Sequence, residues 1–164
     1  MEEMNVQTLF NSPLEMGLRL LFVFKNTKKH SFDLQRLIYY NYLLVHSSDI
    51  PSAPKSLHPD LPNRSCEIVI SREIVSNGLN LLLSKGLLCV EYKKSGVKYK
   101  KNDNTTAFLD YLESKYSKEL NERAIWVCNE FDEIGDRKLD KFIHARLGKW
   151  GSEFSREYRL MGGE

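Results

Sequence analysis

The stretch SREIVSNGLNLLLSKGLLCVEYKKSGVKYKK, residues 71–101, decides the fold of this chain. Its first half carries leucine, isoleucine and valine at the spacing of one helix face, which predicts a helix from about Ser71 to Lys85. Gly86 follows at the position where a left-handed residue ends many helices. Leu87–Tyr92 and Val97–Lys101 are then expected to be two strands joined by a tight turn. The stretch therefore predicts a helix followed by a β-hairpin.

Two more helices are expected before this stretch. The run Ser12-Pro13-Leu14-Glu15 is typical of a helix start, because Ser12 can accept a hydrogen bond from an unpaired backbone N–H and Pro13 has none to leave unpaired. We expect this helix to end at about Asn26, and a second one to begin near Ser31–Asp33. Three helices followed by a hairpin is the element order of a winged helix.

A proline-rich loop, residues 46–65, separates the second helix from the third. Its prolines are Pro51, Pro54, Pro59 and Pro62. Proline excludes a continuous helix or a central strand there. Ile50, Leu57 and Leu61 are apolar anchors that favour an ordered loop lying against a surface. A short segment, Cys66–Ile70, is expected between the loop and the third helix.

The predicted fold class is mainly α with a small β-hairpin. Residues 1–101 would form a winged-helix-like domain with the proline-rich loop 46–65 and a basic wing at 87–101. Residues 102–164 would form a C-terminal helical region packed on that domain. Its helices are expected to be capped by Thr105 or Thr106, by Ser117 and by Asp136.

Composition places the chain among ordinary folded domains. It has 164 residues, of which 41% are apolar and 28% charged. Its three cysteines show no zinc or disulfide spacing, which fits a reducing compartment. The acidic N-terminus does not resemble a signal peptide, and the apolar runs are too short to span a bilayer. We therefore expect a cytoplasmic protein without a metal, a cofactor or a membrane contact.

The wing is strongly basic. Its lysines are Lys93, Lys94, Lys98, Lys100 and Lys101. They are candidate phosphate contacts, because a lysine neutralises a phosphate as a point charge. The alternative is a solvated hairpin whose lysines prevent edge-to-edge aggregation. Arg72 is a weaker candidate, because Glu73 beside it reduces its attraction for phosphate, and sequence-specific DNA binding is not favoured.

Catalysis is not predicted. The four histidines are scattered, and the chain contains no Walker loop, HExxH or dinucleotide-binding motif. His46 and Asp49 could form a catalytic dyad, but a hydrogen bond within the loop is the favoured interpretation. The acidic cluster Glu130, Asp132 and Glu133 is expected to be solvated.

Trp150 and Phe154 near the C-terminus are a candidate docking patch, since large aromatic residues concentrate at the centres of interfaces. Closure of the helical core is the simpler alternative.

Four stretches of the chain resemble a known family. They are LFNSPLEMGLRLLFVF, DLQRLIYYNYLLVHSSDI, SLHPDLPNRSCEIVISREIVSNGLNLLLSKGLL and TTAFLDYLESKYSKELNERAIWV. The chain is similar, from about Leu9 to Phe154, to the middle component of bacterial ABC-three-component defence systems, of which Lamassu is the best-known type.

The resemblance implies a winged-helix adaptor between an SMC-like ABC ATPase and an effector, often a nuclease. DNA would reach the chain only through the assembled complex. The proline-rich loop would dock on the ATPase head or on the effector, with Arg64 offered to a partner carboxylate. The candidate contacts in the loop are His46, Asp49, Leu57, His58, Pro59 and Arg64.

Two other functions stay open at this point. A stand-alone transcription regulator would be a homodimer with its recognition helices one DNA turn apart. A small hydrolase would depend on His46 and Asp49.

Overall fold

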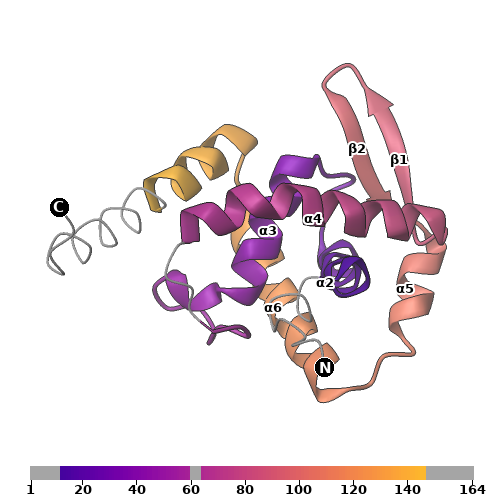
Figure 1. Ribbon diagram of the computed structural model, residues 1–164, viewed down its shortest axis with the longest axis horizontal. Coiled ribbons are helices and arrows are strands. Elements are labelled where there is room, and N and C mark those ends of the chain that lie inside the picture. The colour runs from indigo at the N-terminus through magenta and orange to yellow at the C-terminus, as the bar shows by residue number, and fades with distance from the viewer. Residues whose placement is uncertain (1–11, 60–63, 147–164) are drawn as a thin grey trace, which may run out of the picture.

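The computed structural model describes residues 12–59 and 64–146. Its elements in chain order are α2 (Pro13–Asn26), α3 (Leu34–Val45), the 3-10 turn η1 (Ser47–Asp49), α4 (Arg64–Ser84), β1 (Leu88–Lys93), β2 (Gly96–Lys101), α5 (Asp103–Leu109) and α6 (Lys115–Phe131), followed by a helix over 136–146 (Figure 1). The prediction of a mainly helical chain with a small hairpin is confirmed. Leu61, Trp150 and Phe154 lie outside the described residues.

The first two helices begin where the sequence predicts. The Ser12 hydroxyl accepts from the Glu15 N–H at 3.2 Å, and Pro13 is the first helical residue of α2. The Asp33 carboxylate caps α3 by accepting from the Arg36 N–H at 2.8 Å. A short polar side chain directly before each apolar run is therefore sufficient to locate both starts.

Two caps in the C-terminal region were assigned to the wrong residues. Asn102, not Thr105 or Thr106, caps α5, and the Thr105 hydroxyl accepts from the Asn102 N–H at 3.0 Å. Ser114, not Ser117, caps α6, and its hydroxyl accepts from the Ser117 N–H at 3.1 Å. Thr105 and Ser117 each lie three residues after the actual cap, because a capping side chain and the residue it bonds lie three positions apart.

The predicted start of the third helix is also wrong. α4 begins at Arg64, so the segment expected at Cys66–Ile70 is its first two turns and the proline-rich loop is shorter. Ile68 is buried and extends the apolar face of Val75 and Leu79 by two turns. Ser71, the expected start, lies inside the helix and donates its hydroxyl to the Ile68 carbonyl at 2.9 Å. Packing of Ile68 thus outweighs the low helix propensity of the β-branched residues around it.

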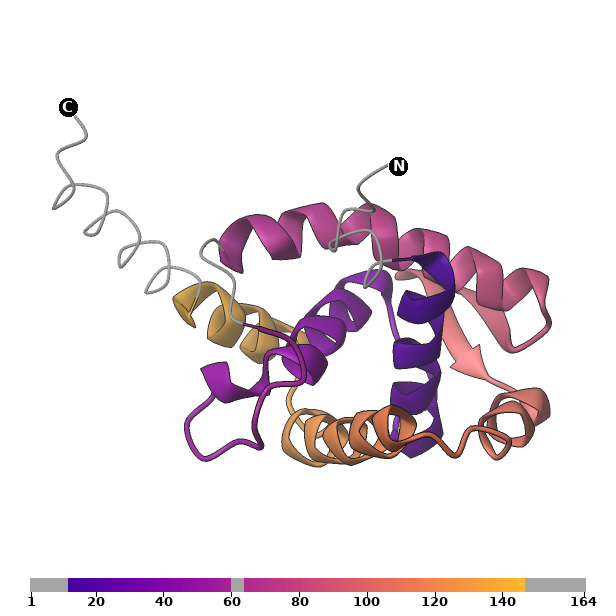
Figure 2. The ribbon, with the colours of Figure 1, turned by 60° about the horizontal axis from the view of Figure 1, so that its bottom comes forward.

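α2 is the centre of the core, in contact with α4 on one side and with α5 and α6 on others (Figure 2). Nearly every residue from Met16 to Phe24 is buried. α2 and α4 cross where Gly17 faces Gly78. A Cβ on Gly78 would lie 3.1 Å from the Gly17 nitrogen and 3.0 Å from the Met16 Cγ, so the two backbones approach closely.

The hairpin begins directly after α4. Gly86, at a φ of +68°, ends the helix, and Gly96, at +116°, follows the turn Lys94-Ser95. Phe32, in the connection between α2 and α3, pairs with Tyr99 of β2 through two backbone hydrogen bonds of 2.9 and 2.7 Å. The base of the hairpin is therefore anchored to the helices. Among the described residues, no helix is long and apolar enough to cross a bilayer.

Candidate functional site

The described part of the proline-rich loop, 46–59, is ordered by its own hydrogen bonds. The N–H groups of Leu57 and His58 both donate to the Val45 carbonyl at 3.1 Å. Ser48 and Ser56 bind each other reciprocally, each backbone N–H donating to the other's hydroxyl at 3.0 and 2.7 Å. The loop therefore folds back on the end of α3 as a preformed surface feature.

Aromatic and cationic side chains fix the loop to the helices beneath it. The His46 ring lies 5.1 Å from the Tyr42 ring and 6.3 Å from the His58 ring, measured between centroids. The His58 Nε2 is 3.0 Å from the Tyr116 hydroxyl of α6. Burial, together with the positive charge of the buried Arg19 and with His46, lowers the pKa of His58 to about 4. His58 is therefore neutral near pH 7.

Most of the predicted loop contacts point inward. His46 is only 1% exposed, and Leu57 packs against the core. Asp49 accepts a hydrogen bond from the Tyr42 hydroxyl of α3, so this bond joins the loop to the helix and is not the bond within the loop that was expected. Pro59 is exposed. Arg64 is the first residue of α4, and its side chain lies outside what the structure describes.

Apart from Pro59, the exposed surface of the loop is made by residues that were not predicted as contacts. Pro51, Ser52 and Lys55 are exposed, and the Ala53 N–H closes a turn onto the Ile50 carbonyl at 3.2 Å. Ser52 takes a φ of +65°, which non-glycine residues rarely adopt. Pro51 could have indicated this turn from the sequence, because proline is common at the second position of a turn whose third position has positive φ.

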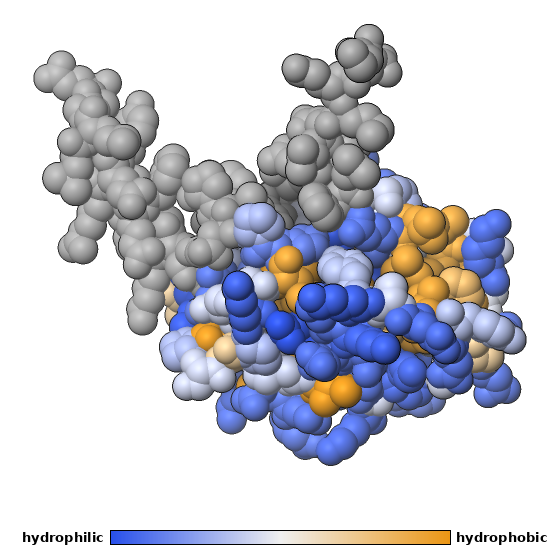
Figure 3. All heavy atoms as spheres, turned by 90° about the horizontal axis from the view of Figure 1, so that it is seen from below, coloured by the Kyte–Doolittle hydropathy of each residue, from blue (hydrophilic) through white to orange (hydrophobic). Residues whose placement is uncertain are grey.

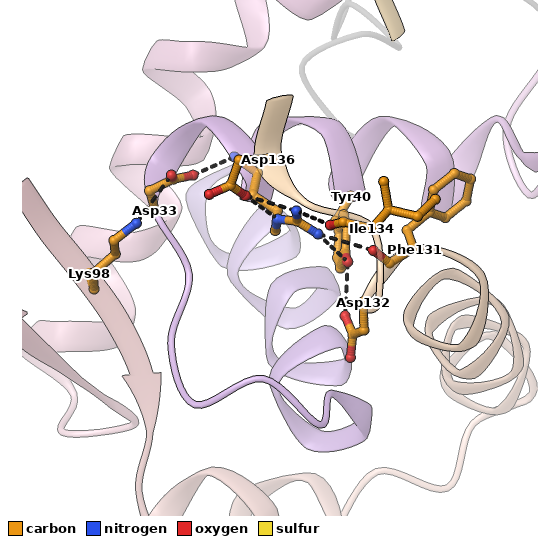
Figure 4. A network of polar contacts seen from close by, with 8 residues as sticks. Asp33, Tyr40, Lys98, Phe131, Asp132, Ile134 and Asp136 are labelled. Atoms are coloured by element: carbon orange, nitrogen blue, oxygen red, sulfur yellow. Dashed lines mark hydrogen bonds and ion pairs between the residues drawn. The ribbon is translucent and has the colours of Figure 1, made fainter. Parts of the chain in front are cut away.

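A buried arginine joins the start of α3 to the C-terminal part of the molecule (Figure 4). The Arg36 side chain of α3 is 3% exposed. It donates to the Asp136 carboxylate at 2.8 Å, to the carbonyls of Phe131 and Ile134 at 3.1 and 2.6 Å, and to the Tyr40 hydroxyl at 3.1 Å. Its guanidinium therefore connects the end of α6 with the start of the helix over 136–146.

Asp132 is buried, so the expectation of a solvated acidic cluster is wrong for this residue. It accepts from the hydroxyls of Tyr40 and Thr27 at 2.8 and 2.7 Å and from the Lys28 N–H at 3.0 Å. Burial and the Asp132 carboxylate raise the pKa of Tyr40. Because three donors satisfy its carboxylate, we assign Asp132 a structural role. Within 12–59 and 64–146, no three His, Cys, Asp or Glu side chains are grouped as a metal site requires.

The wing lysines differ in their surroundings. The Lys98 ammonium lies 3.3 Å from Asp33, and that of Lys93 lies 3.2 Å from Glu91. Lys94 is in the turn, and Lys100 and Lys101 are in the second half of β2. On α4, Arg72 is exposed and donates to the Gln35 side chain at 3.2 Å. The chain's own carboxylates therefore already neutralise two of the predicted phosphate contacts.

The loop and the hairpin lie at opposite ends of the described structure in both ribbon views (Figures 1 and 2). The face seen from below is mainly hydrophilic, with one larger hydrophobic area on the side of α5 (Figure 3). Leu14 of α2 and Phe108 of α5 are exposed, and these two helices are in contact.

Comparison with known proteins finds one family. A family model described as the ABC-three component (ABC-3C) system Middle Component 2 matches residues 9–153. No curated protein and no solved structure matches the chain. The match covers nearly the whole sequence and agrees with the family that four of its stretches resemble. The chain therefore belongs to the Middle Component 2 family of ABC-three component systems.

Proposed function

We propose that this chain is a non-catalytic accessory subunit of a bacterial anti-phage or anti-plasmid defence complex. It bridges an SMC-like ABC ATPase and an effector, often a nuclease, and couples DNA sensing to control of the effector. Membership of a middle-component family supports a role alongside other components. We also propose that residues 1–101 are a winged-helix-like domain, which the order of three helices and a hairpin in its described part supports, together with the Phe32–Tyr99 bridge.

The separation of the loop from the hairpin carries the bridging proposal. A bridging subunit must present two surfaces that do not block each other, and these two features lie at opposite ends (Figure 1). The loop is held in one conformation before a partner arrives, so binding would cost little ordering entropy. Its exposed residues Pro51, Ser52 and Lys55 are the proposed contacts, with the inward-facing residues as their support.

DNA reaches this subunit only within the complex. The wing lysines then contact either DNA that passes over the ATPase heads or an acidic face of a protein subunit. Weak DNA binding by the isolated chain is expected, because two of the wing's five lysines already have carboxylate partners.

The test is co-expression of the chain with the ATPase and the effector encoded beside it. The wild-type chain should co-purify with both. Replacing Lys55 by Glu and Ser52 by Arg should weaken the binding of one partner and leave the other bound. The matched control is Lys118→Glu, which changes an equally exposed lysine on α6. A chain that co-purifies with neither partner would remove the proposal.

A further inference from the structure

The hairpin exposes an apolar pair at its far end. Tyr92 and Val97 are directly opposite each other in the strand register, so their side chains lie on the same face. Tyr92 is 80% exposed and Val97 is 42% exposed. The same face is half-buried at Val90 and Tyr99 and buried at Leu88. An apolar stripe therefore runs from the core to the end of the hairpin, and we call Tyr92 and Val97 the apolar tip.

The opposite face of the hairpin is charged and largely neutralised within the chain. Glu91 pairs with Lys98 in the register, and Lys93 lies on the same face. The Glu91 carboxylate is 3.2 Å from the Lys93 ammonium and 3.6 Å from the His30 ring, and Lys98 reaches Asp33. Lys93 and Lys98 are thus already engaged. Lys100, opposite Cys89, also lies on this charged face, and Lys101, opposite Leu88, lies at the base of the apolar face, so the far end of the apolar face is open.

This distribution favours a protein over a nucleic acid as the partner. A phosphate backbone would attract the lysines, but it offers no surface on which burial of Val97 gains free energy. Burial of Tyr92 and Val97 in an apolar pocket of a protein would gain free energy of binding. Tyrosine is also among the residues that contribute most to the binding energy of interfaces. The turn residue Lys94 is adjacent to the tip and would meet carboxylates at the rim of such a pocket.

We propose that the apolar tip inserts into an apolar pocket, rimmed with carboxylates, on another protein subunit of the same complex. The inference rests on the proposed function of an accessory subunit and names the surface that one partner recognises. The hairpin projects beyond the helical body, as an inserting element must (Figure 1). Its base is fixed by the Phe32–Tyr99 bridge, so insertion needs no rearrangement.

The experiment compares two tyrosines of similar exposure, Tyr92 and Tyr111. Tyr92→Thr with Val97→Thr removes the apolar tip and places threonine, a β-branched residue that favours strands, at both positions. Tyr111→Thr is the control, because Tyr111 is 86% exposed and follows α5, outside the hairpin. Circular dichroism and thermal unfolding establish that all variants are folded. Affinity of the full-length chain is then measured for the ATPase subunit, for the effector subunit and for a DNA duplex.

The tip variant should bind one protein subunit at least about tenfold more weakly, with its affinity for the other subunit and for DNA unchanged. The Tyr111→Thr variant should bind as the wild type does. Loss of DNA affinity alone, a change in self-association, or undiminished binding to both subunits would overturn the inference. In that last outcome the proposed function would stand, whereas a wild-type chain that binds neither subunit would remove both proposals.

Discussion

His58 shows how a single residue ties the loop to the helices. Its ring nitrogen is 3.0 Å from the Tyr116 hydroxyl, and its N–H donates to the end of α3. The sequence indicated His46 and His58 as loop residues of interest, but not that they face inward. Their neighbours Arg19 and Tyr116 are far away in the chain, and no local pattern predicts that they meet.

Acid should loosen this attachment. The pKa of His58 is lowered from an ordinary value of 6.5 to about 4, by burial first and then by Arg19 and His46. The unfolded chain therefore takes up a proton at a higher pH than the folded chain does. The stability that this residue contributes is present above pH 6.5 and is lost as the pH falls toward 4.

The measurement is urea unfolding of the wild type and of His58→Gln between pH 7.5 and pH 4.5. Glutamine can still reach Tyr116 and does not titrate. The difference in the free energy of unfolding between the two proteins should shrink or change sign as the pH falls. Parallel curves across this range would show that His58 does not titrate with folding.

Among the elements, the helices that begin with a short polar residue before an apolar run were predictable, as α2 and α3 show. The start of α4 was not, because it depends on Ile68 packing into a core made by distant elements. The crossing of α2 and α4 was equally hidden. Gly17 and Gly78 are separated by 61 positions, and only the folded chain brings them together.

Gly78→Val should destabilise the chain by roughly 1–3 kcal/mol, because the new side chain would meet the backbone of Gly17 and the side chain of Met16. The control is Asn77→Val, which places the same β-branched residue at an exposed position one residue earlier. Comparing the melting temperatures of the two variants separates the effect of the steric clash from the effect of valine's low helix propensity. Equal melting temperatures would contradict the close approach of the two helices.

Arg36 should be the most sensitive polar residue of the interior. Arg36→Met removes the donors to two carbonyls, to Tyr40 and to Asp136, at a cost of about 2–4 kcal/mol. Arg72→Met, at an exposed arginine with one polar contact, should change stability by less than about 0.5 kcal/mol. Chemical unfolding measures both. An Arg36 variant as stable as the Arg72 variant would show that the network adds nothing.

For the whole molecule, the sequence predicted the fold class and the family, and left the position of the two surfaces undetermined. Lysine content alone left open whether the wing contacts phosphate or is a solvated hairpin. The strand register is what separates an engaged charged face from an open apolar one, because it decides which side chains share a face. The loop likewise has the predicted order but exposes residues other than most of those expected.

We propose that this subunit holds two partners at once and contributes shape and charge to the complex. The most direct measurement compares the masses of the assemblies in two mixtures. One mixture contains the chain, the ATPase and the effector, and the other contains only the ATPase and the effector. We expect one complex containing all three proteins, which separates into ATPase and effector when the chain is left out. An ATPase and effector that associate equally well without the chain would contradict the account.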